Sequence, residues 1–285
     1  MSQQALRPYA EVIGDPIIQS KSPAIHGYWL RQLGIAAEYR AAHVTADGLA
    51  DYIAARRGDA LWRGCNVTMP HKQAIIPLLD RLDDVASRIG AVNTVVRQAD
   101  GSLTGRNTDA PGFLEPLACL GGAQLSGKRA LVLGNGGAAR AIVVALDDAG
   151  LAITLAGRNP AKAQALLDEL APSPAHQPGD LAQFAARGDP AFDLVVNASP
   201  LGMVGNPPLA FDLSHVAAGG IVDDIVTTPL DTPLLRAARG AGFSTIDGLA
   251  MLIGQAAVAF CHFFGQQPLR TDGDAELRQI LTAKG

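Results

Sequence analysis

The segment Gly134–Ala139, which reads GNGGAA, constrains the fold more than any other part of the chain. It directly follows the apolar run ALVL and leads into an amphipathic stretch over Ala138–Ala149, so it matches G-x-G-x-x-A between a strand and a helix. Gly134 suits a tight turn, Gly136 lets backbone amides approach a pyrophosphate, and Ala139 lets the helix pack closely on the strand. A glycine turn without a ligand is the alternative, but the strand–loop–helix context favours a dinucleotide-binding βαβ unit.

The residues after the next strand indicate which dinucleotide is bound. The strand Ile153–Ala156 is followed by Gly157-Arg158-Asn159, with Lys162 one turn further on. An NAD enzyme usually has an acidic residue here for the ribose hydroxyls, whereas arginine grips a phosphate with its planar fork. Arg158 is either a solvated loop residue or a 2′-phosphate contact, and we favour NADP. The predicted cofactor contacts of this region are Gly134, Asn135, Gly136, Gly137, Ala138, Arg158, Asn159 and Lys162.

Composition narrows the class of protein. With 285 residues, 48% hydrophobic content and 31 glycines, the chain predicts two globular domains. The formal charge of −4 predicts no nucleic-acid partner. Three cysteines without a C-x-x-C pair predict neither a metal site nor disulfides, and favour a cytoplasmic location. The richest apolar run, Leu249–Phe264, contains Gln255 and His262, so we expect a buried helix and no membrane association.

The order of expected elements predicts an α/β fold with two domains. Before residue 110, short strands and helices alternate, with mostly parallel connections, and a second βαβ series begins at Arg129. The helix after Asp247-Gly248 follows the last nucleotide-domain strand, so we expect it to return to the first domain. Expected strands are 10–13, 38–43, 63–67, 92–97, 129–133, 152–156, 193–196 and 220–223; expected helices include 25–33, 49–57, 72–79 and 138–149; expected surface loops are 172–179 and 205–208.

The segment Asn66–Lys72, NVTMPHK, supplies a candidate proton carrier. The β-branched and apolar residues before it predict a strand, and Pro70 suits the first turn of a helix, so Lys72 is expected near a helix N-terminus. The helix dipole there disfavours an ammonium, which suits a group that hands over a proton. A single lysine on a helix is usually a solvated surface charge. His71 beside it is expected to be a helix-surface histidine.

Seven ordered motifs resemble those of the shikimate dehydrogenase family over nearly the whole chain. They are VIGDPIIQSKSPAIH from Val12, NVTMPHK from Asn66, AVNTV from Ala91, GRNTDAPGF from Gly105, GNGGAARA from Gly134, NASPLGM from Asn197 and DGLAMLIGQAA from Asp247. The resemblance implies a discontinuous N-terminal substrate domain (1–109 and 248–285) and a Rossmann-type NADP-binding domain (110–247). It also implies NADP-linked, reversible reduction of 3-dehydroshikimate to shikimate in aromatic amino-acid biosynthesis.

Site roles follow from the resemblance position by position. Lys72 and Asp109 correspond to the catalytic pair, and Met203 and Gly248 to positions beside the cofactor. Asp109, Ser20 and Ser22 also have the alternative role of starting a helix. Asn66, Asn93 and Gln255 have that of satisfied buried polar groups. The implied substrate contacts are Ser20, Ser22, Asn66, Thr68, Asn93, Gln255 and Thr227.

Several departures and alternatives remain. Thr227 replaces the tyrosine that the family commonly has near the substrate carboxylate, so this contact departs from the family pattern. Alternative functions are an NAD-dependent quinate/shikimate dehydrogenase, a methylenetetrahydrofolate dehydrogenase, and a catalytically silent NADP sensor on the same scaffold. Arg158 disfavours the first, the Ser20 and Ser22 motif the second, and retention of both Lys72 and Asp109 the third. The expected partner is a small-molecule substrate, and the protein is expected to be a monomer or a homodimer.

Overall fold

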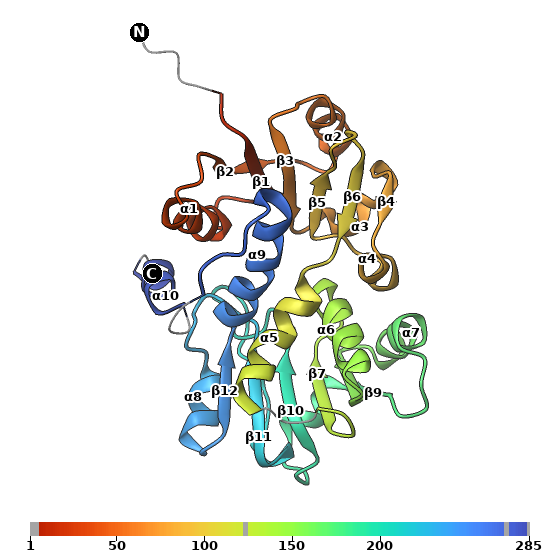
Figure 1. The fold of residues 1–285 in the computed structure, drawn as a ribbon. Helices are drawn as coiled ribbons and strands as arrows, with labels where there is room; N and C mark the ends of the chain where they lie inside the picture. Colours follow the sequence, from red (N-terminus) through yellow and green to blue (C-terminus); the bar gives the residue numbers. More distant parts are fainter. Residues whose placement is uncertain (1–5, 122–124, 271–273, 284–285) are drawn as a thin grey trace. The chain divides into compact units, whose positions relative to one another are not determined.

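The computed structural model describes residues 6–121, 125–270 and 274–283, and it divides into two compact units. Unit 1 comprises Met1–Thr108 and Gln255–Gly285, and unit 2 comprises Asp109–Gly254. The second division falls inside helix α9 (Gly248–Phe264), seven residues after the helix begins, so α9 contributes to both units. Figure 1 labels the elements.

Unit 1 is built on a six-stranded mixed sheet in the order β2-β1-β3-β5-β6-β4. The β1 pairs with β2 and β3, and the β4–β6 pair, are parallel, whereas β5 runs antiparallel to β3 and β6. The elements are β1 (Tyr9–Gly14), α1 (Ser22–Gln32), β2 (Glu38–His43), α2 (Leu49–Arg57), β3 (Trp62–Val67), α3 (His71–Ala74), a 3-10 turn (Ile76–Leu78), β4 (Arg81–Leu82), α4 (Asp84–Ile89), β5 (Thr94–Arg97), β6 (Leu103–Arg106) and, in the second stretch, the C-terminal part of α9 and α10 (Ala275–Thr282).

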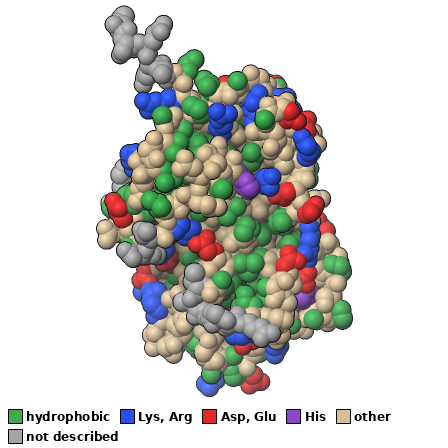
Figure 2. Space-filling view, in the orientation of Figure 1, with side chains coloured by type: hydrophobic (Ala, Val, Ile, Leu, Met, Phe, Trp, Pro, Cys, Tyr) green, Lys and Arg blue, Asp and Glu red, His purple; other side chains and the backbone are tan. Residues whose placement is uncertain are grey.

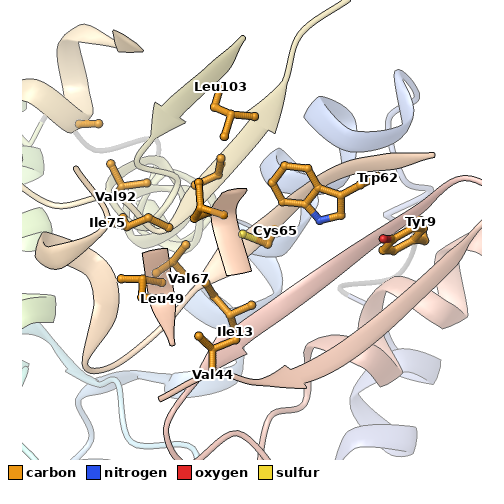
Figure 3. Packing of buried hydrophobic residues seen from close by; sticks show 13 residues of the cluster. Tyr9, Ile13, Val44, Leu49, Trp62, Cys65, Val67, Ile75, Val92 and Leu103 are labelled. Carbon is orange, nitrogen blue, oxygen red and sulfur yellow. The ribbon is translucent and has the colours of Figure 1, made fainter. Parts of the chain in front are cut away.

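A bulge in β3 decides which side chains face each side of this sheet. Tyr9 pairs with Trp62 but Ala10 pairs with Gly64, so Arg63 is the extra residue. Trp62 therefore lies on the same side as Cys65 and Val67, in the apolar cluster of Figure 3. Gly64 and Asn66 face the opposite side. A Cβ on Gly64 would lie 2.8 Å from the Phe263 ring, so glycine here lets α9 lie directly against the sheet.

Unit 2 has a six-stranded, fully parallel sheet in the order β12-β11-β10-β7-β8-β9. In chain order this is the 3-2-1-4-5-6 arrangement of a Rossmann-type fold. The elements are α5 (Asp109–Gly121), β7 (Arg129–Leu133), α6 (Gly137–Asp148), β8 (Ala152–Gly157), α7 (Pro160–Leu170), β9 (Gln177–Asp180), a 3-10 turn (Leu181–Ala185), β10 (Phe192–Asn197), a 3-10 turn (Leu213–His215), β11 (Val216–Asp224), α8 (Pro233–Gly240), β12 (Ser244–Asp247) and the start of α9.

Two expectations about local structure were wrong. The helix expected over 72–79 is only the short α3, because Pro77 lacks the N–H that a continuing helix needs and disfavours helical backbone at Ile76. The loop expected over 172–179 ends in strand β9, where Pro178 is tolerated because β9 is an edge strand.

The surface and the cysteines complete the description. Basic and acidic side chains are interspersed over the face shown in Figure 2. Cys65 and Cys261 are free thiols, and the side chain of Cys119 lies outside the described residues. None of the described helices combines the length and the apolar composition that spanning a lipid bilayer requires.

Candidate functional site

A cluster of buried hydroxyl and amide groups lies on the α9 side of the unit 1 sheet. The Asn66 amide nitrogen donates to Thr94 Oγ1 at 3.0 Å, and Thr94 Oγ1 lies 3.0 Å from Asn93 Oδ1. The backbone N–H of Thr108 also donates to Asn93 Oδ1, at 2.8 Å, and the Thr108 hydroxyl lies 3.5 Å from Gln255 Oε1. The structure thus brings together three predicted substrate contacts: Asn66, Asn93 and Gln255.

The strands explain why these groups meet. Asn66 on β3 and Thr94 on β5 are Cα partners in an antiparallel pair, so their side chains lie side by side on one face. Asn93 directly precedes β5, and its carbonyl accepts from Val67 N at 2.7 Å. A buried side-chain amide without hydrogen-bond partners destabilises the fold by a few kcal/mol. Asn66 and Asn93 therefore need hydroxyl or carbonyl partners at these positions.

Lys72 and Thr68 lie on the segment that leaves β3. The N–H of Thr68 donates to Ile13 O on β1 at 3.0 Å. The N–H of Val92, two residues before β5, donates to Lys72 O at 2.7 Å. These bonds hold the segment against β1 and the start of β5. Both side chains are half-buried. A Cβ on Gly14 would meet Thr68 Cγ2 at 2.5 Å, so glycine at the end of β1 makes room for this threonine.

His71 is not the surface residue that the sequence suggested. Its side chain is buried, and Nε2 lies 2.6 Å from the carbonyl of Val44. The short α3 places His71 against the loop after β2 rather than on an exposed helix face. This histidine is a packing residue of unit 1.

The two serines begin α1. Ser20 Oγ accepts from Ser22 N at 3.3 Å, and Ser22 is the first helical residue, preceded by Lys21 as N-cap without a side-chain cap. Ser22 is buried and Ser20 half-buried. Asp109, which is buried, starts α5 as the sequence indicated and directly follows Thr108 in the chain, although it belongs to unit 2.

The glycine loop of unit 2 connects β7 to α6 as predicted. Gly134 has φ +113°, and a Cβ there would lie 2.9 Å from Ser199 N, so both backbone and space require glycine. Gly136, at the N-cap of α6, has φ −87°, and an added Cβ would meet no described protein atom within 4 Å. The same open space surrounds Gly137. Protein packing therefore does not explain these two glycines, and the open space would admit a phosphate close to the backbone.

The residues after β8 that are predicted to contact the cofactor differ in exposure and in the hydrogen bonds that they make within the protein. Arg158 and Lys162 are exposed after β8. Asn159 is the N-cap of α7, and its side chain accepts from Ala161 N at 3.0 Å and Lys162 N at 3.3 Å. Arg158 also lines a surface pocket of about 350 Å³ in unit 2, together with Asp180, Leu181, Ala182, Ala185, Leu201, Pro208, Leu209 and Ala210.

The remaining predicted residues lie at the ends of unit 2 strands. Thr227 is half-buried in the segment after β11, and Met203 is 38% exposed in the turn after β10. A Cβ on Gly248, at the start of α9, would lie 2.5 Å from the carbonyl oxygens of Ile225 and Val226, so the backbone needs glycine here regardless of any ligand.

Unit 2 also contains buried carboxyl groups that the sequence analysis did not single out. Burial, with the nearby Asp224 and Asp247 charges, raises the pKa of Asp223 well above its usual value. Neither Asp223 oxygen has a hydrogen-bond partner within the described structure. Asp224 accepts from Asn197 Nδ2 at 2.9 Å and Thr232 Oγ1 at 2.7 Å, but burial still raises its pKa. In the described residues, these carboxyls included, no group of three His, Cys, Asp or Glu side chains could hold a metal ion.

The parallel 3-2-1-4-5-6 sheet with its glycine loop defines a class of protein: a Rossmann-type dinucleotide-binding unit joined to a second, discontinuous α/β unit with a buried polar cluster. Comparison with known proteins gives the family. The family description "Shikimate dehydrogenase substrate binding domain" matches residues 12–95, within unit 1. The shikimate dehydrogenase (NADP(+)) of Sphingopyxis alaskensis is 51% identical, over 99% of this chain and 100% of that relative.

Two solved structures agree in fold. The shikimate 5-dehydrogenase of Thermus thermophilus, in complex with NADP(H) and shikimate, has a TM-score of 0.81 at 36% identity, over 95% of this chain and 99% of that one. The quinate dehydrogenase of Corynebacterium glutamicum, in complex with NAD, has a TM-score of 0.84 at 34% identity, over 97% of this chain and 99% of that one. The chain belongs to the shikimate dehydrogenase family.

Proposed function

We propose that this protein catalyses the reversible, NADPH-dependent reduction of 3-dehydroshikimate to shikimate in aromatic amino-acid biosynthesis. The observation that carries the proposal is the buried cluster of Asn66, Asn93, Thr108 and Gln255 in unit 1. Lys72 belongs to the same unit, on the segment that follows β3, the strand of Asn66. Several convergent amide and hydroxyl groups match a small ligand with several hydroxyls. The names of the Sphingopyxis and Thermus relatives support this substrate.

In this proposal the substrate residues divide by chemistry. Ser20 and Ser22, at the start of α1, bind the carboxylate through hydroxyls and backbone amides. Thr68, Asn66, Asn93 and Gln255 bind ring hydroxyls. Thr227 stands in place of the family's usual tyrosine, and its shorter side chain makes a weaker carboxylate contact.

We assign the catalytic step to Lys72 and Asp109. When the ketone is reduced, negative charge develops on its oxygen, and the Lys72 ammonium stabilises that charge and donates a proton to the oxygen. Asp109 orients the ammonium and accepts a hydrogen bond from a substrate hydroxyl. In the oxidation direction, Lys72 takes the proton back.

NADP, when bound, supplies or accepts the hydride. The backbone of Gly136 and Gly137 would hold the pyrophosphate, since there is open space at both glycines. Arg158 and Lys162 would hold the 2′-phosphate, and their exposed cations suit that charge. Asn135, Ala138 and Met203 border the cofactor in this assignment, as does Gly248, whereas Asn159 contributes by starting α7.

The setting of the enzyme forms part of the proposal. A cytoplasmic location is supported by the thiols of Cys65 and Cys261, which are free. The proposed partner is the small-molecule substrate alone, for a monomer or a homodimer.

The test is steady-state oxidation of shikimate and of quinate with NADP and with NAD. We expect the highest kcat/KM with shikimate and NADP. Preference for quinate with NAD would favour the function named for the Corynebacterium protein. NADP binding without turnover of either substrate would favour a sensor, and would overturn the proposed activity.

A further inference from the structure

Tyr39 is connected to the polar cluster although no sequence motif contains it. It is the second residue of β2, and its ring reaches across β1 on the α9 side of the sheet, where the small residue Ala10 is its Cα partner. Its hydroxyl donates to Asn66 Oδ1 at 2.6 Å, in a buried position. The Tyr39 side chain therefore lies behind a predicted substrate contact rather than in solvent.

Aromatic packing fixes the Tyr39 ring. The His26 ring stacks on it with centroids 3.9 Å apart and planes 2° apart, and the ring of Phe263 lies 6.4 Å away. Burial lowers the pKa of His26 to about 3, so this imidazole is neutral and packs as an aromatic ring. Burial also raises the pKa of Tyr39 well above 10, so the phenol keeps its proton and can donate it.

The Tyr39 bond determines the direction of the Asn66 amide. Because Oδ1 accepts from Tyr39, the Nδ2 group points the other way, toward Thr94 Oγ1 at 3.0 Å and Asn93 O at 3.3 Å. Both amide hydrogens then have protein acceptors, whereas Oδ1 has a second lone pair. In this orientation Asn66 offers a ligand an acceptor and no donor.

We propose that Tyr39 is a positioning residue that holds Asn66 as an acceptor for a ring hydroxyl of the substrate. The inference rests on the proposed function and adds a residue to it. The same direction continues along the cluster, because Thr94, which accepts from Asn66, donates to Asn93 Oδ1. Without the Tyr39 hydroxyl, the Asn66 amide can turn over and present N–H groups that repel a hydroxyl donor.

The test compares Tyr39→Phe with the parent on shikimate and on two analogues, each lacking one of the two ring hydroxyls that are not oxidised. We expect the kcat/KM for shikimate to fall about tenfold, mainly through KM, with the KM for NADP unchanged. For the analogue that lacks the hydroxyl bound by Asn66, we expect the loss to shrink to under twofold. Thermal unfolding checks that the variant is folded.

Tyr52→Phe is the matched control, because the Tyr52 hydroxyl donates to Glu11 at 2.7 Å and not to the cluster. It should leave kcat/KM within twofold for all three substrates. If Tyr39→Phe does not fold, Thr94→Val removes the acceptor of Asn66 Nδ2 and should likewise cost shikimate more kcat/KM than the analogue that lacks the hydroxyl bound by Asn66. An equal loss for all three substrates would overturn the Tyr39 inference alone, whereas a parent without shikimate turnover would overturn the proposed function and the inference with it.

Discussion

The hydroxyl of Thr108 lies 3.5 Å from the side-chain oxygen of Gln255, a residue 147 positions later. Thr108 ends the first stretch of unit 1 and Gln255 begins the second, so this contact joins the two stretches where the chain leaves and re-enters the unit. Thr108 also accepts from Asn93 Nδ2 at 2.9 Å. One small buried side chain therefore links Asn93, directly before β5, to Gln255 on α9.

Replacing Thr108 with valine keeps the shape of the side chain but removes the hydroxyl that contacts Asn93 and Gln255. Because Asn93 and Gln255 would lose a buried partner, we expect the free energy of unfolding to fall by about 1 to 3 kcal/mol. Urea unfolding without ligand measures the change. Thr282→Val, which removes an exposed hydroxyl that donates to the carbonyls of Arg278 and Gln279 in α10, is the control and should change stability by less than about 0.5 kcal/mol. Equal losses of unfolding free energy for the two variants would contradict a stabilising role of the Thr108 hydroxyl.

Lys72→Ala should leave the KM for shikimate nearly unchanged and reduce kcat by at least about a hundredfold, the scale of lost general acid–base help. Steady-state kinetics at saturating NADP measures both. Lys128→Ala, on the turn before β7, is the control and should match the parent. A Lys72→Ala turnover within a few-fold of the parent would exclude Lys72 as the proton carrier.

The sequence predicted the nucleotide unit better than the polar cluster, for a physical reason. Around Gly134 the strand, turn and helix are adjacent in the chain, so a local pattern records them. Strand β9 was missed because proline and glycine dominate its four residues, and an edge strand is stabilised by its neighbour β8 rather than by its own propensity. The helix expected over 72–79 from its apolar spacing ends at Ala74, because Pro77 prevents the helix from continuing.

The cluster depends on contacts between residues far apart in the chain. Asn66, Asn93 and Gln255 were predicted by resemblance. Their partner Thr94 lies in a matching motif but was not singled out, and Tyr39 lies in no motif. Tyr39 lies on a strand with mostly exposed neighbours, and it is buried by residues distant in the chain, among them His26 and Phe263 of α9. His71 was misjudged for the same reason, because its partner Val44 lies 27 residues earlier.

Two glycines of the same loop should respond differently to alanine. Gly134→Ala forces a side chain into positive φ and against Ser199, so we expect it to destabilise the protein by about 1 to 3 kcal/mol. Gly136→Ala has an allowed φ and open space, so stability should stay near the parent while NADP binding weakens at least about tenfold. Thermal unfolding and NADP titration of both variants test this. Unchanged NADP binding in Gly136→Ala would show that no phosphate approaches that backbone.

Arg158→Ala should weaken NADP far more than NAD, because only NADP carries the 2′-phosphate. The expected loss is about 1.5 to 3 kcal/mol, typical of a hydrogen bond to a charged group. Titration of both cofactors measures it. Arg129→Ala, at the opposite end of the unit 2 sheet, is the control and should affect neither. Equal weakening of NADP and NAD by Arg158→Ala would mean that Arg158 supports the loop rather than selecting the cofactor.

Asp223 should make stability depend on pH in the direction opposite to an ordinary ion-paired carboxylate. Its pKa in the folded state is raised, mainly by burial, so above the unfolded value near 3.8 the folded protein holds a proton that the unfolded chain releases. Raising the pH through this window therefore lowers the free energy of unfolding, by up to about 1.4 kcal/mol per pH unit.

Asp223→Asn removes this dependence because an amide does not titrate in the window. We expect the Tm of Asp223→Asn, relative to the parent, to rise by at least about 2 °C between pH 5 and pH 8. Asp224→Asn is the contrast: it disturbs the bonds with Asn197 and Thr232, so it should be less stable than the parent at both pH values. A Tm difference between Asp223→Asn and the parent that stays constant with pH would mean that Asp223 has the same proton affinity in the folded and unfolded chain, and that its burial does not govern its ionisation.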